Sequence, residues 1–319
     1  MKAELEPIPE AEKAVVKEEF EKRYRQLLGN RYDEFLKYSL SYITKSIRVN
    51  TLKATVAEVK KRLQQQNFTL EQIPWCDKGF WVKGERTDLG NLIEHALGYI
   101  YVQEAASMLP ASVLQPEPGD VVLDMCASPG SKTTQMASMM ENTGLVVAND
   151  ISGARMKPLG LNLQRCGIMN VAVTVMYGQQ FRKGNVSFDK VLVDAPCSGT
   201  GTIRRSPDTL RIWNPGMIKR LSKTQKSLIE SAFRVLKNGG TLVYSTCSNE
   251  PEENEEVIDY LLDKFSGATL EKINLNINKS EPILNFENKN YRSEIKKCLR
   301  IWPQDNNTEG FFVARITKN

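Results

Sequence analysis

The chain has 319 residues, of which 41% are apolar and 25% are charged, and its formal net charge is +5. Such a chain can bury a sizeable core, and its length predicts two domains. No apolar run approaches the roughly 18 residues of a membrane span, and the charged opening lacks a secretory signal, so we expect a cytoplasmic protein without membrane contact. The mildly positive charge permits a nucleic-acid partner without requiring one.

The cysteines and the single histidine narrow the possible chemistry. Six cysteines, at positions 76, 126, 166, 197, 247 and 298, include no CxxC pair. This spacing argues against a disulfide framework and a thiolate metal site, so we expect reduced thiols and no bound metal. His95 is the only histidine, which nearly excludes a histidine-based triad, metal site or general base.

The N-terminal region, residues 1–110, is predicted to be helical at first and then mixed. Apolar residues at helical spacing before Ser46 predict two or three amphipathic helices. After them we expect a strand at Ser46–Asn50, a helix from Thr55 to Gln66 and extended segments from Phe68 to Val82. Together these elements predict a small β-α-β layer.

From Pro116 onward, short β-rich runs alternate with helices, which predicts an α/β domain with a doubly wound parallel sheet over residues 111–319. The expected strands are Val121–Cys126, Leu145–Asn149, Val171–Met176, Lys190–Ala195 and Thr241–Thr246, with a late edge strand at Phe311–Ile316. The expected helices lie near Ser131–Met140, Gly153–Cys166, Met217–Leu236 and Glu253–Phe265. The Asn-rich stretch 274–290 is expected to be a loop.

A turn of small residues, Cys126–Lys132, follows the first strand of this sheet and opens a helix. Asp150 ends the next strand twenty residues beyond Gly130, where a carboxylate can accept hydrogen bonds from ribose hydroxyls. These features predict a nucleoside site, with a plain tight turn as the structural alternative. A P-loop NTPase is disfavoured because Ser131 occupies a required glycine position and Pro129 removes a backbone donor.

Cys197 and Cys247 each follow an apolar run that predicts a buried parallel strand. Ligands collect beyond the carboxyl ends of such strands. If the two strands are neighbours, the thiols lie within one or two strand spacings of about 4.8 Å and can face one substrate. A regulatory disulfide is the alternative for this pair. Free cysteines are often inert core residues, which is the interpretation for Cys76, Cys166 and Cys298.

Several motifs occur in consistent order: QEAASMLP, DMCASPGSKT, AND, FDKVLVDAPCSGTG, STCS followed by ENE, and RIWP with TEGFF. Over about residues 45–316, the chain resembles the Sun-type (Fmu-like) RNA cytosine-5 methyltransferases. The resemblance implies a Rossmann-like methyltransferase sheet with a smaller α+β N-terminal RNA-binding domain, and S-adenosylmethionine as cofactor. It also implies formation of 5-methylcytidine in RNA, where we expect tRNA, with rRNA as the alternative, and a monomeric enzyme.

The chemistry of this family explains why two thiols are useful. Carbon 5 of cytosine is a poor nucleophile until a thiolate adds to carbon 6, and a second group must then assist breakdown of the adduct. The resemblance assigns attack to Cys247 and breakdown to Cys197, although DNA cytosine-5 methyltransferases use the opposite assignment and spacing alone does not separate the two. It further implies that Asp194 hydrogen-bonds the amino edge of a flipped cytosine and that Lys132 holds the same base.

The resemblance also implies binding residues. Tyr177 stands where the family usually has aspartate, and Gln304 where it often has histidine, so reduced cofactor affinity is expected. These two departures support an alternative function, a catalytically weak RNA-binding or assembly protein with the same fold. The expected RNA contacts are Arg48, Asn50, Lys53, Arg204 and Arg205. The expected cofactor residues are Cys126, Ala127, Ser128, Pro129, Gly130, Ser131, Lys132, Asp150, Arg155, Tyr177 and Asp194.

Overall fold

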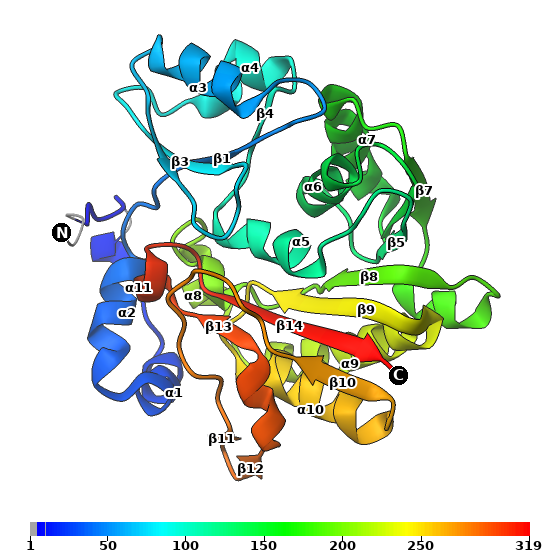
Figure 1. Cartoon of the computed structure of the whole chain (residues 1–319). Coiled ribbons are helices and arrows are strands. Elements are labelled where there is room, and N and C mark those ends of the chain that lie inside the picture. Colours follow the sequence, from blue (N-terminus) through cyan, green and yellow to red (C-terminus); the bar gives the residue numbers. More distant parts are fainter. Residues whose placement is uncertain (1–4, 10) are drawn as a thin grey trace.

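The structure, a computed structural model, describes residues 5–9 and 11–319. An eight-stranded sheet forms its centre (Figure 1). Its strands are β5 (Val121–Asp124), β6 (Leu145–Asp150), β7 (Val171–Val175), β8 (Phe188–Asp194), β9 (Leu236–Thr246), β10 (Ala268–Glu271), β13 (Leu299–Ile301) and β14 (Phe311–Lys318). The order is β7-β6-β5-β8-β9-β14-β10, and β13 pairs with β14. Strands β5 to β9 are parallel, as the sequence predicts.

The predicted edge position of the last strand is wrong. β14 lies between β9 and β10 and runs antiparallel to both. Its residues from Phe311 to Ala314 are all buried, and such a continuous apolar run is typical of a strand that is covered on both faces. β9, which ends just before Cys247, therefore has a neighbouring strand on each side.

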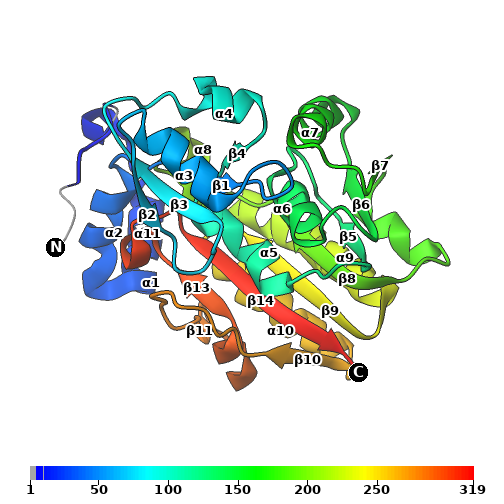
Figure 2. The same cartoon turned by 45° about the horizontal axis from the view of Figure 1, so that its top comes forward.

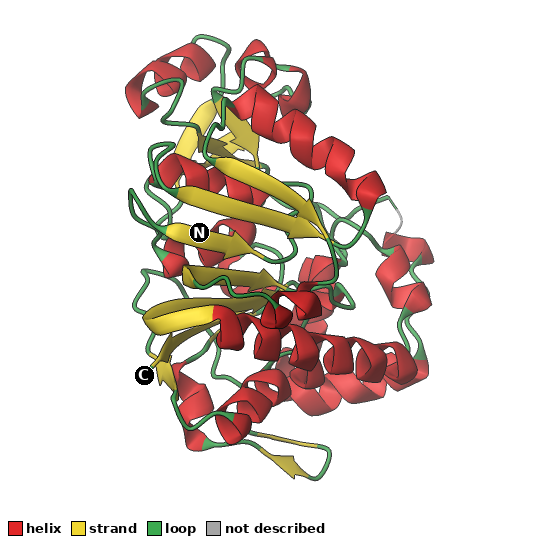
Figure 3. Cartoon of the chain, turned by 90° about the vertical axis from the view of Figure 1, so that its right-hand side faces the viewer, coloured by secondary structure: helices red, strands yellow, loops and turns green. Residues whose placement is uncertain are grey.

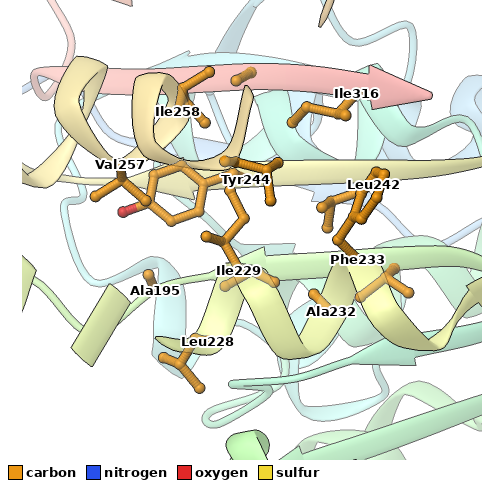
Figure 4. Packing of buried hydrophobic residues seen from close by; sticks show 14 of the residues in the cluster. Ala195, Leu228, Ile229, Ala232, Phe233, Leu242, Tyr244, Val257, Ile258 and Ile316 are labelled. Atoms are coloured by element: carbon orange, nitrogen blue, oxygen red, sulfur yellow. The ribbon is translucent and has the colours of Figure 1, made fainter. Parts of the chain in front are cut away.

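Two layers of helices cover the sheet (Figure 3). On one face lie α9 (Pro215–Val235) and α10 (Glu255–Lys264). α9 begins at Asn214, whose side chain accepts a hydrogen bond from the Met217 N–H at 2.8 Å, with a proline at the first helical position. Its apolar side packs against β9 and β14, as Figure 4 shows for Ile229, Ala232, Phe233, Leu242, Tyr244 and Ile316.

The other face of the sheet is covered by α5 (Leu109–Leu114), α6 (Ser131–Met139) and α7 (Gly153–Cys166). Residues of α5 and α6 share a buried cluster with Val122, Leu192 and Val243 of the sheet. The helix at Gly153–Cys166 has the predicted bounds, and the helix near Ser131 ends one residue earlier than predicted. These helices fix the turns that follow β5 and β6.

A second, four-stranded antiparallel sheet precedes the large one, in the order β2-β3-β1-β4. The predicted β-α-β layer is thus corrected, because the fourth strand was not expected and pairs beside β1. The helix after β1 begins at Thr55, whose side chain accepts from the Glu58 N–H while Glu58 accepts from the Thr55 N–H. The elements are β1 (Ser46–Val49), α3 (Val56–Gln64), β2 (Thr69–Gln72), β3 (Gly79–Lys83), α4 (Ile93–Ala96) and β4 (Ile100–Val102).

The first two helices, α1 (Glu18–Leu28) and α2 (Tyr32–Ser39), pack on the C-terminal half rather than on the small sheet. Their Phe20, Tyr24 and Phe35 share a buried aromatic cluster with Trp213 and Trp302. Figure 2 shows α2 beside α11 (Pro303–Asn306). The division expected after residue 110 falls within α5, and α1 and α2 lie spatially with the C-terminal half.

The remaining elements are short: α8 (Asp208–Ile212), β11 (Asn285–Phe286) and β12 (Lys289–Asn290). The last two form a small hairpin within the stretch 274–290, which is otherwise largely irregular as predicted. Among the described residues, no helix is long and apolar enough to cross a membrane. The same residues contain no group of three side chains suited to hold a metal ion.

Candidate active site

Two thiols meet at the carboxyl ends of neighbouring parallel strands. β8 and β9 are adjacent, with Asp194 opposite Ser245. The condition under which the two thiols can face one substrate is therefore fulfilled. Beyond each strand end the chain turns and carries a cysteine. The Sγ atoms of Cys197 and Cys247 lie 3.2 Å apart, and both side chains are partly buried. The two thiols are therefore close enough to act on one group.

The environment makes the two thiols unequal. The hydrogen bond with Cys247, together with burial and the nearby Glu253 carboxylate, raises the pKa of Cys197 well above its ordinary value. A thiol that keeps its proton is a poor nucleophile, because the thiolate is the reactive form. The 3.2 Å contact itself allows either sulfur to donate.

An ion pair stands beside the thiols. Lys132 Nζ, from the first turn of α6, lies 2.7 Å from Asp194 Oδ2, and Asp194 Oδ1 accepts a hydrogen bond from Ser245 Oγ at 2.8 Å. Burial alone would lower the pKa of Lys132, but the Asp194 carboxylate raises it above its ordinary value. The pair thus presents a fixed cation and a fixed carboxylate next to Cys247.

The turn after β5 is shaped by its own backbone. The Ala127 N–H donates to Asn149 O at 2.7 Å, and the Gly130 N–H donates to Ala127 O at 2.7 Å. Gly130 has φ +102°, and an added Cβ would lie 2.8 Å from Leu159 Cδ1, so glycine is required there. Burial raises the pKa of the Cys126 thiol, so this cysteine stays protonated.

Asp150 closes the same region from the end of β6. Its carboxylate is 2% exposed and accepts hydrogen bonds from the backbone N–H groups of Ser128 and Ser152, each at 3.3 Å. Arg155 places Nη1 3.4 Å from Asp150 Oδ2 and donates from Nη2 to Ser128 O at 2.7 Å. The arginine therefore supports the turn.

A cavity of about 480 Å³ joins this turn to the thiols. Ala127, Pro129, Gly130 and Ser131, by contrast, build the turn without forming part of the cavity wall. The wall includes eight of the residues predicted from the sequence: Cys126, Ser128, Asp150, Arg155, Tyr177, Asp194, Cys197 and Cys247.

Sequence reasoning missed Asp124, the last residue of β5. It is 1% exposed, its Oδ2 accepts from Thr133 Oγ1 at 2.6 Å, and its Oδ1 has no partner among the described residues. Burial, with Asp194 nearby, raises the pKa of Asp124 to about 7. Its place at a strand end, two residues before the turn, was the signal that could have identified it.

Two family profiles and several known proteins match this chain. A family profile described as 16S rRNA methyltransferase RsmB/F matches residues 111–317, and one for the N-terminal domain of 16S rRNA methyltransferase RsmF matches residues 16–105. A tRNA (cytosine(49)-C(5))-methyltransferase of Pyrococcus abyssi is 47% identical over 95% of this chain and 98% of its own length. The chain belongs to the RsmB/F family. It is therefore an S-adenosylmethionine-dependent RNA cytosine-5 methyltransferase.

One solved structure has the same fold, and a bacterial relative is similar in sequence. A crystal structure of a methyltransferase homologue from Pyrococcus horikoshii superposes with a TM-score of 0.87 at 37% identity, covering 98% of this chain and all of that one. A ribosomal RNA small subunit methyltransferase F of Aliivibrio fischeri is 44% identical over 90% of this chain. The chain spans only 60% of the length of that bacterial relative.

The RNA contacts predicted for this RsmB/F chain need correction at three positions. Arg48, Asn50 and Arg204 are 2–4% exposed. Arg48 donates to Gln103 and Thr134 side chains, and Asn50 donates to the backbone of residues 98 and 166. Arg204 donates to the backbone of residues 41, 42 and 308. These side chains hold the two sheets and the N-terminal segment together, because a buried donor must be paired inside the protein.

The other two basic residues reach the surface in part. Lys53 donates to the carbonyls of Leu97 and Arg165 at 3.0 and 2.8 Å. Arg205 is 63% exposed and pairs with the buried Glu309 at 3.3 Å. Arg205 is thus the member of the predicted set that is best placed to meet a phosphate. Gln304 lies apart from the cavity wall, and its amide atoms are buried without a partner among the described residues.

Proposed function

We propose that this enzyme forms 5-methylcytidine in tRNA, with Cys247 as the attacking thiolate. The observation that carries the proposal is the 3.2 Å contact between two thiols in the wall of a cavity that also contains Asp150. The choice of tRNA is supported by the Pyrococcus abyssi relative, which is 47% identical over 95% of this chain. Monomeric state and cytoplasmic location stay predictions.

The lining of the cavity fits S-adenosylmethionine. Asp150 is placed to accept hydrogen bonds from ribose hydroxyls, the Cys126–Lys132 turn contributes Cys126 and Ser128 to the wall, and Tyr177 offers an exposed ring there. When bound, this cofactor supplies an electrophilic methyl group on its sulfonium. Tyr177 cannot act as an acceptor carboxylate, which supports the expectation of reduced affinity.

The reaction then follows from the residues around the base. The Cys247 thiolate forms a bond to carbon 6 of cytosine, the carbon 5–carbon 6 double bond opens, and carbon 5 becomes nucleophilic. With the cofactor bound, carbon 5 would take the methyl group while the bond from that methyl group to the sulfonium sulfur breaks and leaves its electron pair on the sulfur. Asp194 accepts a hydrogen bond from the exocyclic amino group, and Lys132 holds that carboxylate in place through their 2.7 Å ion pair.

Breakdown of the adduct needs a good leaving sulfur. The proton on carbon 5 leaves to water, the double bond re-forms, and the bond between carbon 6 and Cys247 breaks with its electron pair going to sulfur. Cys197, whose sulfur lies 3.2 Å from that of Cys247 in the free enzyme, donates its S–H to the departing sulfur. The hydrogen bond stabilises the departing thiolate, which is the role that the proposal gives to Cys197.

The activity test uses unmodified tRNA and 16S rRNA transcripts with S-adenosylmethionine labelled on its methyl group. We expect labelled 5-methylcytidine in tRNA, and bisulfite sequencing locates the position. Product on rRNA alone would overturn the choice of tRNA. Absence of product on every transcript would overturn the enzymatic proposal and favour the RNA-binding alternative.

Gly201 offers a test of how tightly the Cys247 backbone is held. Its N–H donates to Cys247 O at 2.9 Å, and an added Cβ would lie 2.7 Å from Cys247 O and 2.2 Å from Gly310 O. Gly201→Ala must push these backbones apart, so we expect turnover to fall about 100-fold, the effect of a small misplacement of reacting groups. Gly160→Ala is the matched control, because its Cβ would meet nothing within 4 Å; equal turnover in both variants would contradict the prediction.

A further inference from the structure

A buried carboxylate lies directly behind the two thiols. Glu253 is fully buried and accepts hydrogen bonds from the Ser198 N–H at 3.0 Å and the Ser198 hydroxyl at 2.5 Å. It also accepts from the Ser248 hydroxyl, and from Gln225 Nε2 at 3.0 Å. Ser198 follows Cys197 and Ser248 follows Cys247, so a single carboxylate is bonded to the residue after each thiol.

We propose that Glu253 is a positioning residue that holds the two thiol-bearing turns at contact distance and keeps the proton between the sulfurs on Cys197. Its use in catalysis rests on the proposed function, but the geometry does not. Because Glu253 binds both turns while Cys197 and Cys247 are fifty residues apart in the chain, it is a direct polar link between them. No role was assigned to it from the sequence.

The chemistry of the contacts requires an acceptor. Four donor groups converge on the two carboxylate oxygens, and a carboxylate is the side chain that accepts from all of them without donating. Burial raises the pKa of Glu253 to about 7, so its negative charge is fully present above that pH, where it disfavours a thiolate at Cys197. A glutamine of the same shape would replace one acceptor oxygen by a donor NH₂ and would remove the charge.

Glu250 supplies a matched control on the same segment. It is equally buried, and its carboxylate accepts from Arg23 at 2.8 Å and from Tyr24 and Trp213 at 2.9 Å each. Those contacts anchor the segment to α1 and α8–α9, not to the turn that carries Cys197. Glu250→Gln therefore perturbs a buried carboxylate without removing any hydrogen bond between Glu253 and the thiol-bearing turns.

The test measures the thiols in the full chain, without RNA or cofactor. Iodoacetamide labelling of Cys247 and Cys197 is followed by peptide mass spectrometry across pH, for the unmodified protein, Glu253→Gln and Glu250→Gln. The titratable groups that lie around these sulfurs are Lys132, Asp194, Tyr244 and Glu253. Of these four, only Glu253 is changed in any of the variants. We expect Cys247 to react faster than Cys197, and Glu253→Gln to reduce that ratio about tenfold, the effect of one pKa unit on a thiolate population.

Phenylarsine oxide gives a second readout, because it binds two neighbouring thiols together and releases water. We expect Glu253→Ala to lose this bridge and Glu250→Gln to keep it. If Glu253→Ala does not fold, Glu253→Gln takes its place. The proposal would be overturned if folded Glu253 variants kept both the Cys247-to-Cys197 labelling ratio of the unmodified protein and the arsenical bridge. It would also be overturned if the Glu250 and Glu253 variants changed these two readouts equally. An inactive enzyme with the expected thiol behaviour would overturn the proposed function alone.

Discussion

Cys197→Ala is expected to leave the enzyme covalently bound to its RNA, whereas Cys247→Ala is expected to form no adduct. Without Cys197, the attacking sulfur at 3.2 Å loses the S–H donor that stabilises it as a leaving group. Attack and methyl transfer proceed, but elimination slows by about 10²–10⁴-fold, the contribution typical of a positioned proton donor. Without Cys247, carbon 6 has no nucleophile and turnover stops.

Denaturing gel electrophoresis of enzyme with labelled tRNA and S-adenosylmethionine separates these outcomes. A slowly migrating protein–RNA band should accumulate with Cys197→Ala and be absent with Cys247→Ala. Cys298→Ala is the matched control, because that thiol is buried away from the site. A trapped band with Cys247→Ala, and none with Cys197→Ala, would reverse the two roles.

Arg300→Met is expected to lower the free energy of unfolding by about 3–5 kcal/mol, since it leaves a buried carboxylate without its cation. Arg300 and Glu255 are 1% and 0% exposed, and two N–H groups of Arg300 reach the Glu255 oxygens at 2.8 and 2.6 Å. Arg300 also donates to Asn249 O at 3.0 Å. The pair thus anchors the segment that leads away from Cys247.

Urea unfolding at constant pH measures this effect. The double variant with Arg300→Met and Glu255→Gln should recover at least half of the lost stability, because the uncompensated charge is gone and an acceptor for the Ile283 N–H is kept. A loss below about 1 kcal/mol in the single variant, as for an exposed ion pair, would contradict a structural role.

Local patterns were sufficient for the parallel sheet. The alternation of apolar strands with helices from Val121 to Thr246 follows from side-chain period and turn residues, which are local properties. The fourth strand of the small sheet and the interior place of the last strand were missed, because pairing between distant segments leaves no local pattern. Likewise, nothing near Phe20 or Tyr24 indicates that these rings pack on Trp213 and Trp302.

The thiol site was predictable for a similar reason. Cys197 and Cys247 each mark a strand end, and adjacent parallel strands bring their ends together. The RNA contacts were less predictable, because the sequence does not distinguish a buried arginine from a surface one. Arg48 and Arg204 are paired inside the protein, whereas the neighbouring Arg205 is exposed.

For acidic residues, too, the sequence does not distinguish a buried side chain from a surface one. Glu253 follows the STCS segment in a run of polar residues that predicts a solvated helix start, yet it is fully buried and bonded to both thiol-bearing turns. Asp124 is likewise buried at the end of β5, where its Oδ1 has no partner among the described residues. Partners far apart in sequence decide the role of each.

The most direct test of the central claim is the site of covalent attachment to tRNA that contains 5-fluorocytidine. Fluorine at carbon 5 cannot leave as a proton, so the adduct persists after methyl transfer, and the cross-linked peptide can be sequenced by mass spectrometry. The proposed mechanism predicts that the nucleotide is attached to Cys247, in the peptide that contains Ser245, Thr246 and Ser248. Attachment to Cys197, or no adduct with tRNA that is a competent substrate when unmodified, would contradict it.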